Sequence, residues 1–193
     1  MEGRILEFVQ PIRDKKKIDA IKKIFRGSSL RDYCLFVLGI NSGLRISDLL
    51  KLQISDVVDE KGKVQDRIMT REKKTGKGKN FPVSDTSRKA IEEYLGSRKY
   101  ESEEPLFISR KGKGFLKRQR AYRIINEAAR YVGIKEKIGT HTLRKTFGYH
   151  AYQAGKDITL IQKLFNHSCP KVTLSYIGIT QDDLDDVYLN LNL

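Results

Sequence analysis

Histidine and arginine stand three residues apart once in this 193-residue chain, in a pattern that suits phosphate chemistry. His141 and Arg144 fall at the expected start of a helix, where residues three apart share one face. A guanidinium, an imidazole and the N-terminus of a helix can together bind a phosphate. Taken alone the pair is weak evidence, because a histidine near a helix start is more often a surface or capping residue.

A second arginine occupies an unusual place. Arg45 follows Ser42-Gly43-Leu44 directly after an apolar segment, and Asp48 comes three residues later. An arginine between two apolar helices is partly buried and needs a partner. Asp48 can orient the guanidinium while part of it stays available for a bidentate contact with an oxyanion. A structural salt bridge is the simpler interpretation of these two residues alone.

A tyrosine completes the set of residues that could do chemistry. Tyr176 follows His167 by nine residues, beyond the break at Pro170. A tyrosine hydroxyl, with a pKa of ~10, is a poor nucleophile unless nearby cations and a proton acceptor stabilise its phenolate. In isolation Tyr176 is better interpreted as a core aromatic, as are most of the nine tyrosines.

The charge of the chain favours a polyanionic partner. Thirty-eight basic and 24 acidic residues give a net charge of +14. Residues 61–79 hold eight basic residues against Asp66 and Glu72, and residues 110–120 hold six with no acid. Two such segments could neutralise phosphates along a duplex, although either one alone could be a solvated loop. Charge does not decide between DNA and RNA.

The composition excludes several classes of protein. A hydrophobic content of 39% indicates a globular domain, and no apolar run approaches the ~20 residues that span a bilayer. The N-terminal residues lack the apolar stretch of a signal peptide. The two cysteines, Cys34 and Cys169, lie far apart in the sequence and do not make a disulfide framework or a metal knuckle. We expect a cytoplasmic protein with no membrane partner.

The elements that must position these residues are mostly helical. One segment differs: residues 54–83 are rich in β-branched residues and glycine, which predicts a small antiparallel sheet with a Lys/Gly hairpin tip. A short strand or a buried extended segment is expected over residues 105–108. Thr140 is expected to cap the helix over 141–154. The helices are expected at about 18–27, 29–43, 46–50, 85–95, 117–132, 141–154 and 157–166, with a helical turn around Tyr176 and a last helix opened by Thr180.

The motifs in order resemble the catalytic domain of the tyrosine recombinases, the phage integrase family. They are SGLRISDLLKL, the Lys/Gly hairpin, HTLRKTFGYHAYQAG and LIQKLFNHSCPKVTLSYIGI, spread over roughly residues 15–180. The resemblance implies an α+β, mainly helical fold. It also implies a catalytic domain over 1–180 and a C-terminal tail over 181–193, and we expect the family's N-terminal core-binding domain to be absent. One departure is Asn166, which stands before His167 where a glycine is usual.

The resemblance implies a role for each site residue. Arg45 and Arg144 would clamp the scissile phosphate, and Tyr176 would attack phosphorus to give a 3′-phosphotyrosyl link and a free 5′-hydroxyl. His141 would accept a proton or a hydrogen bond near that attack, and His167 would donate a hydrogen bond to a phosphate oxygen.

Two further roles follow from the same resemblance. Asp48 would orient the site, and a hairpin lysine would protonate the leaving 5′-oxygen. Register with the family's Lys-Thr-Gly pattern favours Lys74, with Lys73 and Lys77 as alternatives. The residues expected to contact DNA are basic side chains of the two charged segments: Lys73, Lys77, Lys79, Arg110, Lys111, Lys113, Lys117, Arg118 and Arg120.

The resemblance implies double-stranded DNA as the partner, with a homo-oligomer, a tetramer, on DNA and a monomer or weak oligomer without it. We expect no metal and no other cofactor, because the site's cations supply the charge and no Walker A motif is present. Relaxation of DNA like that by a type IB topoisomerase, and a non-catalytic nucleic-acid-binding module, remain the alternatives. The tail places Leu184, Val187, Tyr188 and Leu191 at helical spacing, for docking in cis or on a neighbouring protomer.

Overall fold

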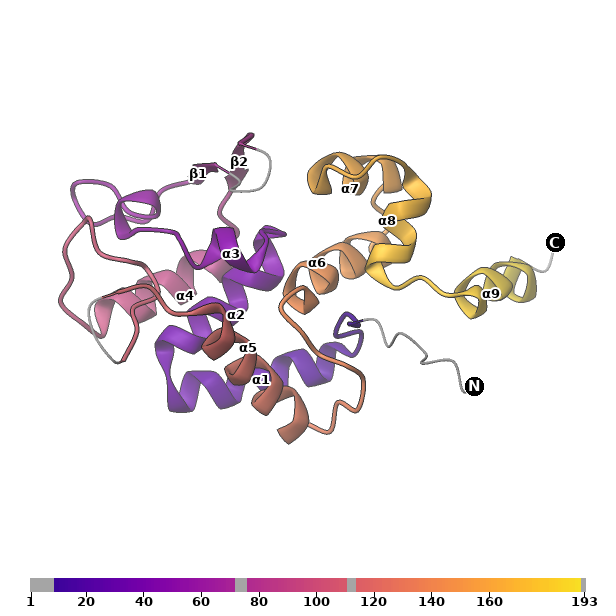
Figure 1. Ribbon diagram of the computed structural model, residues 1–193, viewed down its shortest axis with the longest axis horizontal. Helices are drawn as coiled ribbons and strands as arrows, with labels where there is room; N and C mark the ends of the chain where they lie inside the picture. The colour runs from indigo at the N-terminus through magenta and orange to yellow at the C-terminus, as the bar shows by residue number, and fades with distance from the viewer. Residues whose placement is uncertain (1–8, 72–75, 111–113, 192–193) are drawn as a thin grey trace, which may run out of the picture.

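The computed structural model describes residues 9–71, 76–110 and 114–191 of the chain, and these ranges are mainly helical (Figure 1). A two-stranded sheet is formed by β1 (Arg67–Arg71) and β2 (Gly78–Pro82). The helices are α1 (Lys15–Ser28), α2 (Leu30–Ser42), α3 (Ile46–Leu49), α4 (Asp85–Gly96), α5 (Arg118–Tyr131), α6 (Thr142–Gln153), α7 (Ile158–Phe165), α8 (Pro170–Ile177) and α9 (Gln181–Leu191). The α+β, mainly helical class is therefore confirmed.

Local sequence signals account for several helix ends. Ser29 caps α2 by accepting a hydrogen bond from the Asp32 N–H, and Asp157 caps α7 by accepting from the Thr159 N–H at 2.6 Å. Thr140 does not cap α6, contrary to expectation. His141 occupies the cap position with no capping bond from its side chain, while the Thr140 hydroxyl accepts a hydrogen bond from Arg118 at 2.9 Å.

The sheet is smaller than the segment 54–83 from which it was predicted. Its strands are antiparallel, with Ile68 opposite Phe81, and residues 72–75 of the expected hairpin tip lie outside the described residues. Residues 54–56 form a 3₁₀ turn, and the following stretch contributes one isolated bridge between Val58 and Val64. The β-branched residues there are buried in the core, and their burial rather than strand pairing explains the apolar pattern.

Helix α6 lies between two apolar clusters. The larger core is built chiefly by α1, α2, α4 and α5, and a smaller cluster of Ile161, Phe165 and Ile177 joins α7 to α8. Helix α6 contacts α2 on one side and α7 and α8 on the other (Figure 1). Gly148 permits the second contact, because a Cβ there would lie 2.6 Å from Ile177 and 2.7 Å from Phe165. The HTLR segment at the start of α6 is thereby placed between the two clusters.

The segment before α1 is bound along α6. The Ile12 N–H donates to the Thr146 hydroxyl at 2.9 Å, and the Ile12 carbonyl lies 2.9 Å from Nε2 of His150. Arg13 donates to the carbonyl of Gly178, just after α8. Residues 9–14 therefore connect the start of the domain to both α6 and the end of α8.

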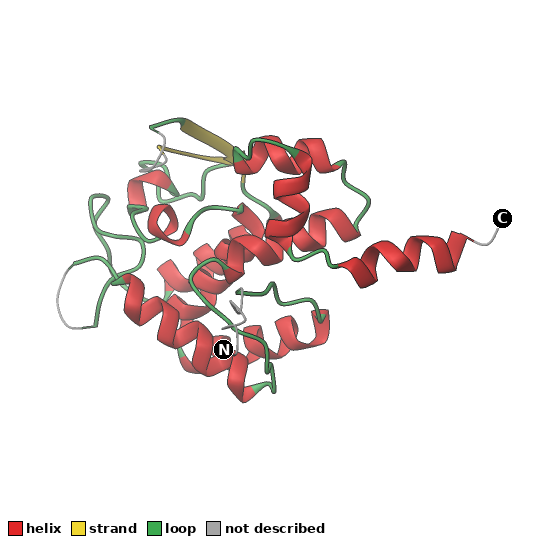
Figure 2. Ribbon diagram, turned by 45° about the vertical axis from the view of Figure 1, so that its right-hand side comes forward, coloured by secondary structure: helices red, strands yellow, loops and turns green. Residues whose placement is uncertain are grey.

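Helix α9 projects away from the rest of the protein (Figures 1 and 2). It begins at a reciprocal cap, in which the Thr180 N–H donates to Asp183 at 2.7 Å and the Asp183 N–H donates back to the Thr180 hydroxyl at 3.4 Å. Val187, Tyr188 and Leu189 are exposed on it. No helix in the described ranges is both long enough and apolar enough to cross a membrane.

Candidate active site

Tyr176 lies in the last turn of α8, against the start of α6. Its hydroxyl oxygen is 3.3 Å from Nδ1 of His141, and its ring centroid is 4.8 Å from that of His167 and 5.6 Å from that of Phe165. The side chain is half-buried. Helix α6, helix α8 and the turn between α7 and α8 thus bring the tyrosine and two of the three histidines together.

Burial and the nearby cations shift the pKa of Tyr176 in opposite directions. Burial raises the pKa of its hydroxyl, while the charges of Arg144 and Arg45 and a hydrogen bond from Arg144 lower it. The pKa of His141 is lowered, first by burial and then by the charges of Arg118, Lys145, Arg144 and Arg45. A neutral imidazole therefore faces a protonated tyrosine, which is the arrangement that a proton acceptor and a nucleophile need.

Arg144 is the most deeply buried cation of this cluster, with 2% of its surface exposed. It donates from Nη1 to the Gly43 carbonyl at 2.6 Å and from Nη2 to the Phe165 carbonyl at 2.9 Å, and its guanidinium lies 4.4 Å from the Phe165 ring centroid. These contacts join α6 to the loop before α3 and to the end of α7. The guanidinium is held rigidly beside Tyr176.

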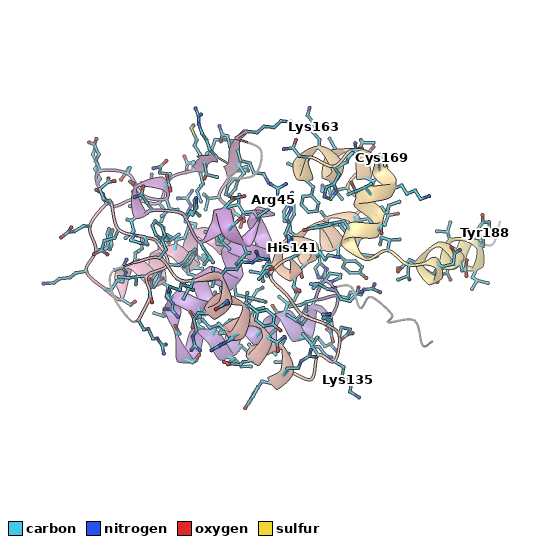
Figure 3. The ribbon with its side chains drawn as sticks, viewed as in Figure 1. Arg45, Lys135, His141, Lys163, Cys169 and Tyr188 are labelled. Atoms are coloured by element: carbon cyan, nitrogen blue, oxygen red, sulfur yellow. The ribbon has the colours of Figure 1, made fainter. Side chains whose placement is uncertain are left out.

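Arg45 enters the site from the N-terminus of α3. The backbone turn before it needs Gly43, which has a φ of 61° and would place a Cβ 2.8 Å from Phe147. The charge of Arg45 lowers the pKa of His167 and His141, so the guanidinium acts on the same cluster as Arg144. Figure 3 shows Arg45 and His141 near the middle of the molecule, with Lys135 and Tyr188 at its periphery.

Asp48 is buried one turn after Arg45, with 2% of its surface exposed. Its N–H donates to the Arg45 carbonyl at 2.9 Å, and its carboxylate accepts a hydrogen bond from the Ser47 hydroxyl at 3.4 Å. The backbone bond places both residues in one helical turn. Its role in orienting the site stays a prediction.

His167 is fixed by the turn between α7 and α8. Its Nδ1 lies 3.1 Å from the hydroxyl of buried Thr173, and its pKa is lowered by burial and by the charges of Arg144 and Arg45. Asn166, which stands where the family pattern has glycine, ends α7 in the left-handed conformation with φ 54° and ψ 44°. Asparagine tolerates this conformation better than most residues, so the turn is kept.

The sheet approaches the same cluster. Nζ of Lys77 lies 3.4 Å from the Asn166 side-chain oxygen, and Nζ of Lys79 lies 3.5 Å from the Gly43 carbonyl. Lys74, the favoured catalytic lysine, and Lys73 lie outside the described residues. Strand β2 and the residue before it therefore border the site.

The second basic segment approaches from α5. Lys111 and Lys113 lie outside the described residues, whereas Arg110, Lys117, Arg118 and Arg120 are exposed. Arg118 donates to the Thr140 hydroxyl, next to His141, and its charge contributes to the lowered pKa of that histidine. The start of α5 is thus a second element, besides the sheet, that borders the site.

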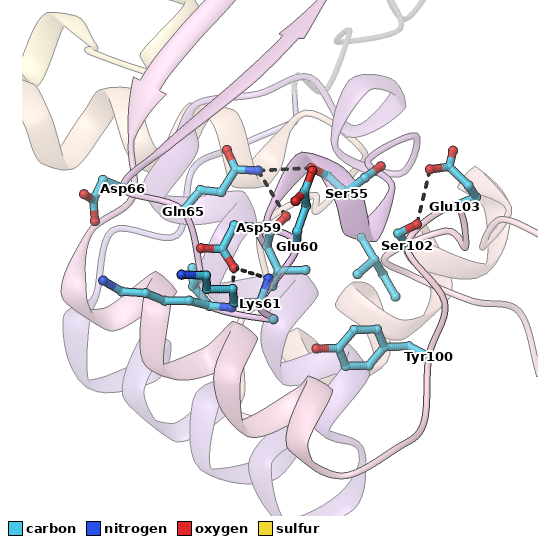
Figure 4. A pocket seen from close by; sticks show the side chains of 14 residues that line it. Ser55, Asp59, Glu60, Lys61, Gln65, Asp66, Tyr100, Ser102 and Glu103 are labelled. Atoms are coloured by element: carbon cyan, nitrogen blue, oxygen red, sulfur yellow. Dashed lines mark hydrogen bonds between the residues drawn. The ribbon is translucent and has the colours of Figure 1, made fainter.

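A separate hollow of about 1360 Å³ contains none of the candidate residues (Figure 4). Its polar groups largely satisfy one another: the Gln65 amide donates to the Ser55 and Val58 carbonyls, and the Asp59 carboxylate accepts from the N–H groups of Lys61 and Lys63. Within the described ranges, no group of three His, Cys, Asp or Glu side chains is arranged to hold a metal ion.

One residue that the sequence analysis did not single out belongs to the cluster. Lys145 is buried, with 8% of its surface exposed, and its Nζ lies 4.9 Å from the ring centroid of Tyr176. The available signal was its position directly after Arg144, in the first turn of the helix that His141 precedes. The HTLR pattern alone does not indicate which group a lysine at this position would contact.

The mainly helical fold and the order of the motifs define the class of the protein: a catalytic domain of a tyrosine recombinase. The sequence matches the family described as the phage integrase family over residues 13–182. It is 44% identical over 183 residues to the probable integrase/recombinase YoeC of Bacillus subtilis (strain 168), covering 95% of this chain and 97% of that relative. The chain therefore belongs to the phage integrase family and is a DNA breaking-rejoining enzyme.

Solved structures share the fold. The crystal structure of XerA recombinase matches with a TM-score of 0.75 at 22% identity, covering 96% of this chain and 65% of that one. The XerH site-specific recombinase bound to a palindromic difH substrate, in a post-cleavage complex, matches with a TM-score of 0.72 at 20% identity, covering 93% and 52%. The chain thus spans about two thirds and about half of these two recombinases.

Proposed function

We propose that Tyr176 is the nucleophile of a site-specific DNA strand exchange. The observation that carries the proposal is the distance of 3.3 Å between the Tyr176 hydroxyl and Nδ1 of His141, in a cluster that also holds Arg144 and His167. A tyrosine with an acceptor on its oxygen and cations around it has the activation that this nucleophile requires.

The cleavage step moves one proton and exchanges one bond. Neutral His141, with its own proton on Nε2, accepts the hydroxyl proton of Tyr176 at Nδ1. The tyrosine oxygen forms a bond to the scissile phosphorus as the bond from phosphorus to the 5′-oxygen breaks. The products are a 3′-phosphotyrosyl link and a 5′-oxygen that takes up a proton. Reversal with a second 5′-hydroxyl rejoins DNA, and because the phosphodiester energy is kept in the covalent link, no ATP is consumed.

Cations stabilise the phosphorane-like transition state. Arg45 and Arg144 would bind its non-bridging oxygens, and His167 would donate a hydrogen bond to one of them. Loss of one preorganised donor at such a site slows a reaction by about 10²- to 10³-fold. These cations supply the charge neutralisation for which other phosphoryl-transfer enzymes use metal ions. Asp48 would hold the turn that carries Arg45.

A hairpin lysine would protonate the leaving 5′-oxygen. We assign this role to Lys74, with Lys73 and Lys77 as the alternatives. The contacts of Lys77 with Asn166 and of Lys79 with Gly43 support it, because they bring the strand that follows the hairpin tip to the border of the site.

Double-stranded DNA is the partner that this chemistry requires, and the similar Tn1549 transposon integrase is in complex with transposon right end DNA in its structure. Basic side chains border the site from two elements: Lys77 and Lys79 from the sheet, and Arg118 from the start of α5. Cytoplasmic action is supported by the free thiols of Cys34 and Cys169.

Assembly on DNA would use the C-terminal helix. Helix α9 projects from the body and exposes Val187, Tyr188 and Leu189, while α7 exposes Leu160 and Leu164. Burying such apolar side chains against a neighbouring copy would stabilise a tetramer on DNA. Deletion of residues 181–193 should then reduce DNA-dependent self-association in analytical ultracentrifugation, and an unchanged association would contradict docking in trans.

A nicked suicide duplex tests the proposed nucleophile. The wild-type protein should form an adduct with this DNA that survives denaturation in detergent, and Tyr176→Phe should form none. Tyr131→Phe, which changes an exposed tyrosine at the end of α5, is the matched control and should behave as wild type. An adduct from Tyr176→Phe would contradict the proposal.

A further inference from the structure

Lys145 is a buried cation whose ammonium faces an aromatic ring. It lies in the first turn of α6, where its N–H donates to the His141 carbonyl at 2.9 Å. With 8% of its surface exposed it is among the few buried charged residues of the described chain. Its Nζ lies 4.9 Å from the ring centroid of Tyr176. The side chain therefore runs from the HTLR segment to the ring of the proposed nucleophile.

The burial of this lysine is not explained by an ion pair. Within the part of the chain that the structure describes, the salt bridges join other residues, and Lys145 has no carboxylate partner. Lysine is rarely buried without a counter-charge, because desolvation of the ammonium is costly. That cost shows in the pKa of Lys145, which burial lowers. The contact that remains for the charge is the ring of Tyr176.

We infer that Lys145 is a positioning residue of the cleavage reaction, whose ammonium orients the ring of Tyr176 and stabilises the phenolate as it forms. The inference rests on the proposed assignment of Tyr176 as the nucleophile. It concerns a lysine distinct from the hairpin lysine, because Lys145 contacts the attacking group and not the leaving group.

The contact strengthens as the reaction proceeds. Before attack, the ammonium is attracted by the quadrupole of a neutral ring. When the hydroxyl proton passes to Nδ1 of His141, negative charge spreads from the oxygen onto the ring, and the ammonium then faces an anion. An interaction that is stronger in the transition state than in the ground state accelerates the chemical step.

The same charge acts on the proton acceptor. Lys145 is one of four cations that lower the pKa of His141, so it helps to keep that imidazole neutral. The charged and titratable groups that face Tyr176 and His141 come from several elements: Arg144 and Lys145 on α6, Arg45 before α3, His167 between α7 and α8, and Arg118 on α5. Removing Lys145 therefore alters both partners in the proton transfer.

Lys145→Met separates the role of the charge from the role of the side-chain volume. Methionine keeps the apolar stem and removes the buried ammonium, so the thermal stability should be unchanged or higher. Single-turnover adduct formation with the nicked duplex should be about 10- to 30-fold slower, the effect expected for a desolvated cation–π contact. Its pH–rate profile should move to higher pH. A purely structural lysine would lower stability and rate together and leave the profile in place.

Two further variants frame the result. Lys145→Arg keeps a cation over the ring and should recover most of the rate, and Lys135→Met removes the same charge from an exposed site and should match wild type. A wild-type rate and profile for Lys145→Met, or no recovery in Lys145→Arg, would overturn the inference.

A titration without DNA provides an independent readout. In protein labelled at the tyrosine Cζ carbons, the pKa of Tyr176 should be higher in Lys145→Gln than in the wild type, and an unchanged value would overturn the inference even if Lys145→Met does not fold. Failure of the proposed function gives a different result. An adduct from Tyr176→Phe would show that Tyr176 is not the nucleophile, whereas the effect of Lys145 on the pKa of Tyr176 would still be measured in the titration.

Discussion

The guanidinium of Arg144 donates to the carbonyl oxygen of Gly43 at 2.6 Å, across 101 positions of sequence. Gly43 stands two residues before Arg45, so this bond fixes the distance between the two segments that carry the proposed phosphate clamp. Lys79 from the sheet lies 3.5 Å from the same carbonyl. One backbone oxygen thereby links α6, the start of α3 and strand β2.

Arg144→Lys should separate catalysis from binding. A lysine cannot bridge the Gly43 and Phe165 carbonyls, so we expect adduct formation to fall by about 100-fold or more. The free energy of unfolding should fall by about 1–3 kcal/mol, because a buried carbonyl loses its donor. Affinity for the duplex should change by less than about tenfold, since one phosphate contact contributes little to binding.

The control for this variant is Arg123→Lys, which changes an exposed arginine on α5. Adduct assays and gel-shift titrations of both variants give the comparison. Equal losses of cleavage and of binding in Arg144→Lys would count against a catalytic role for Arg144.

Acid should destabilise the protein through its histidines. Burial lowers the pKa values of His141, His150 and His167 below the usual 6.5. As pH falls below 6.5 the unfolded chain binds protons that the folded chain excludes, so this contribution is present above pH 6.5 and is lost on acidification. Denaturant unfolding at pH 7 and pH 5 should show the decrease.

His150→Gln isolates one part of this effect. Glutamine can still donate to the Ile12 carbonyl but does not titrate, so the loss of stability between pH 7 and pH 5 should be smaller than in the wild type.

The pH dependence of the wild-type reaction follows from His141. The rate of adduct formation should begin to fall only below pH 6.5, because the lowered pKa of His141 keeps the imidazole neutral above that pH. A rate that already falls above pH 6.5 would contradict the assignment of His141 as acceptor.

Gly148→Ala should disturb the packing of α8 against α6. The added Cβ would meet Ile177 at 2.6 Å and Phe165 at 2.7 Å, so α7 and α8 must move away from α6. Overpacking of this kind costs about 1–3 kcal/mol, and the displaced Tyr176 should cleave more slowly. Gly96→Ala, where the added Cβ would meet nothing within 4 Å beyond its chain neighbours and its own helix backbone, should leave the rate unchanged. Equal behaviour of the two variants in melting and adduct assays would refute the close approach.

Asn166 should be replaceable by glycine but not by alanine. Its φ of 54° costs a residue with a Cβ about 1–2 kcal/mol unless a local polar group compensates. We expect Asn166→Ala to lower the free energy of unfolding by about 1 kcal/mol and Asn166→Gly to be close to neutral. Chemical denaturation measures both. An alanine variant as stable as wild type would show that the turn imposes no such constraint.

Much of the helical structure could be predicted from short-range sequence patterns. Ser29 and Asp157 cap their helices through neighbours two or three residues away, and such short-range patterns are visible in a sequence. The predicted extent of the sheet was wrong, because the β-branched side chains of Val57, Val58 and Val64 are buried in the core, and Val58 and Val64 form an isolated bridge rather than strands. Thr140 does not cap α6, because His141 occupies the cap position, and the Thr140 hydroxyl accepts a hydrogen bond from Arg118, 22 residues earlier.

The site divides in the same way. The order of Arg45, His141, Arg144, His167 and Tyr176 in the sequence marked them as one set, and the structure brings them to one cluster. What the sequence could not show is the network that supports them, such as the Arg144–Gly43 bond and the contact of Lys145 with Tyr176. These depend on how α6 packs between the two clusters.

Mass spectrometry of the covalent adduct tests the central claim most directly. Trypsin cleaves after Lys171, and no Lys or Arg follows to residue 193, so one peptide carries both Tyr176 and Tyr188. Fragmentation distinguishes the two tyrosines, and Tyr188 serves as the internal control. We predict that the added nucleotide mass lies on Tyr176. Its presence on Tyr188, or on a peptide outside residues 172–193, would contradict the account.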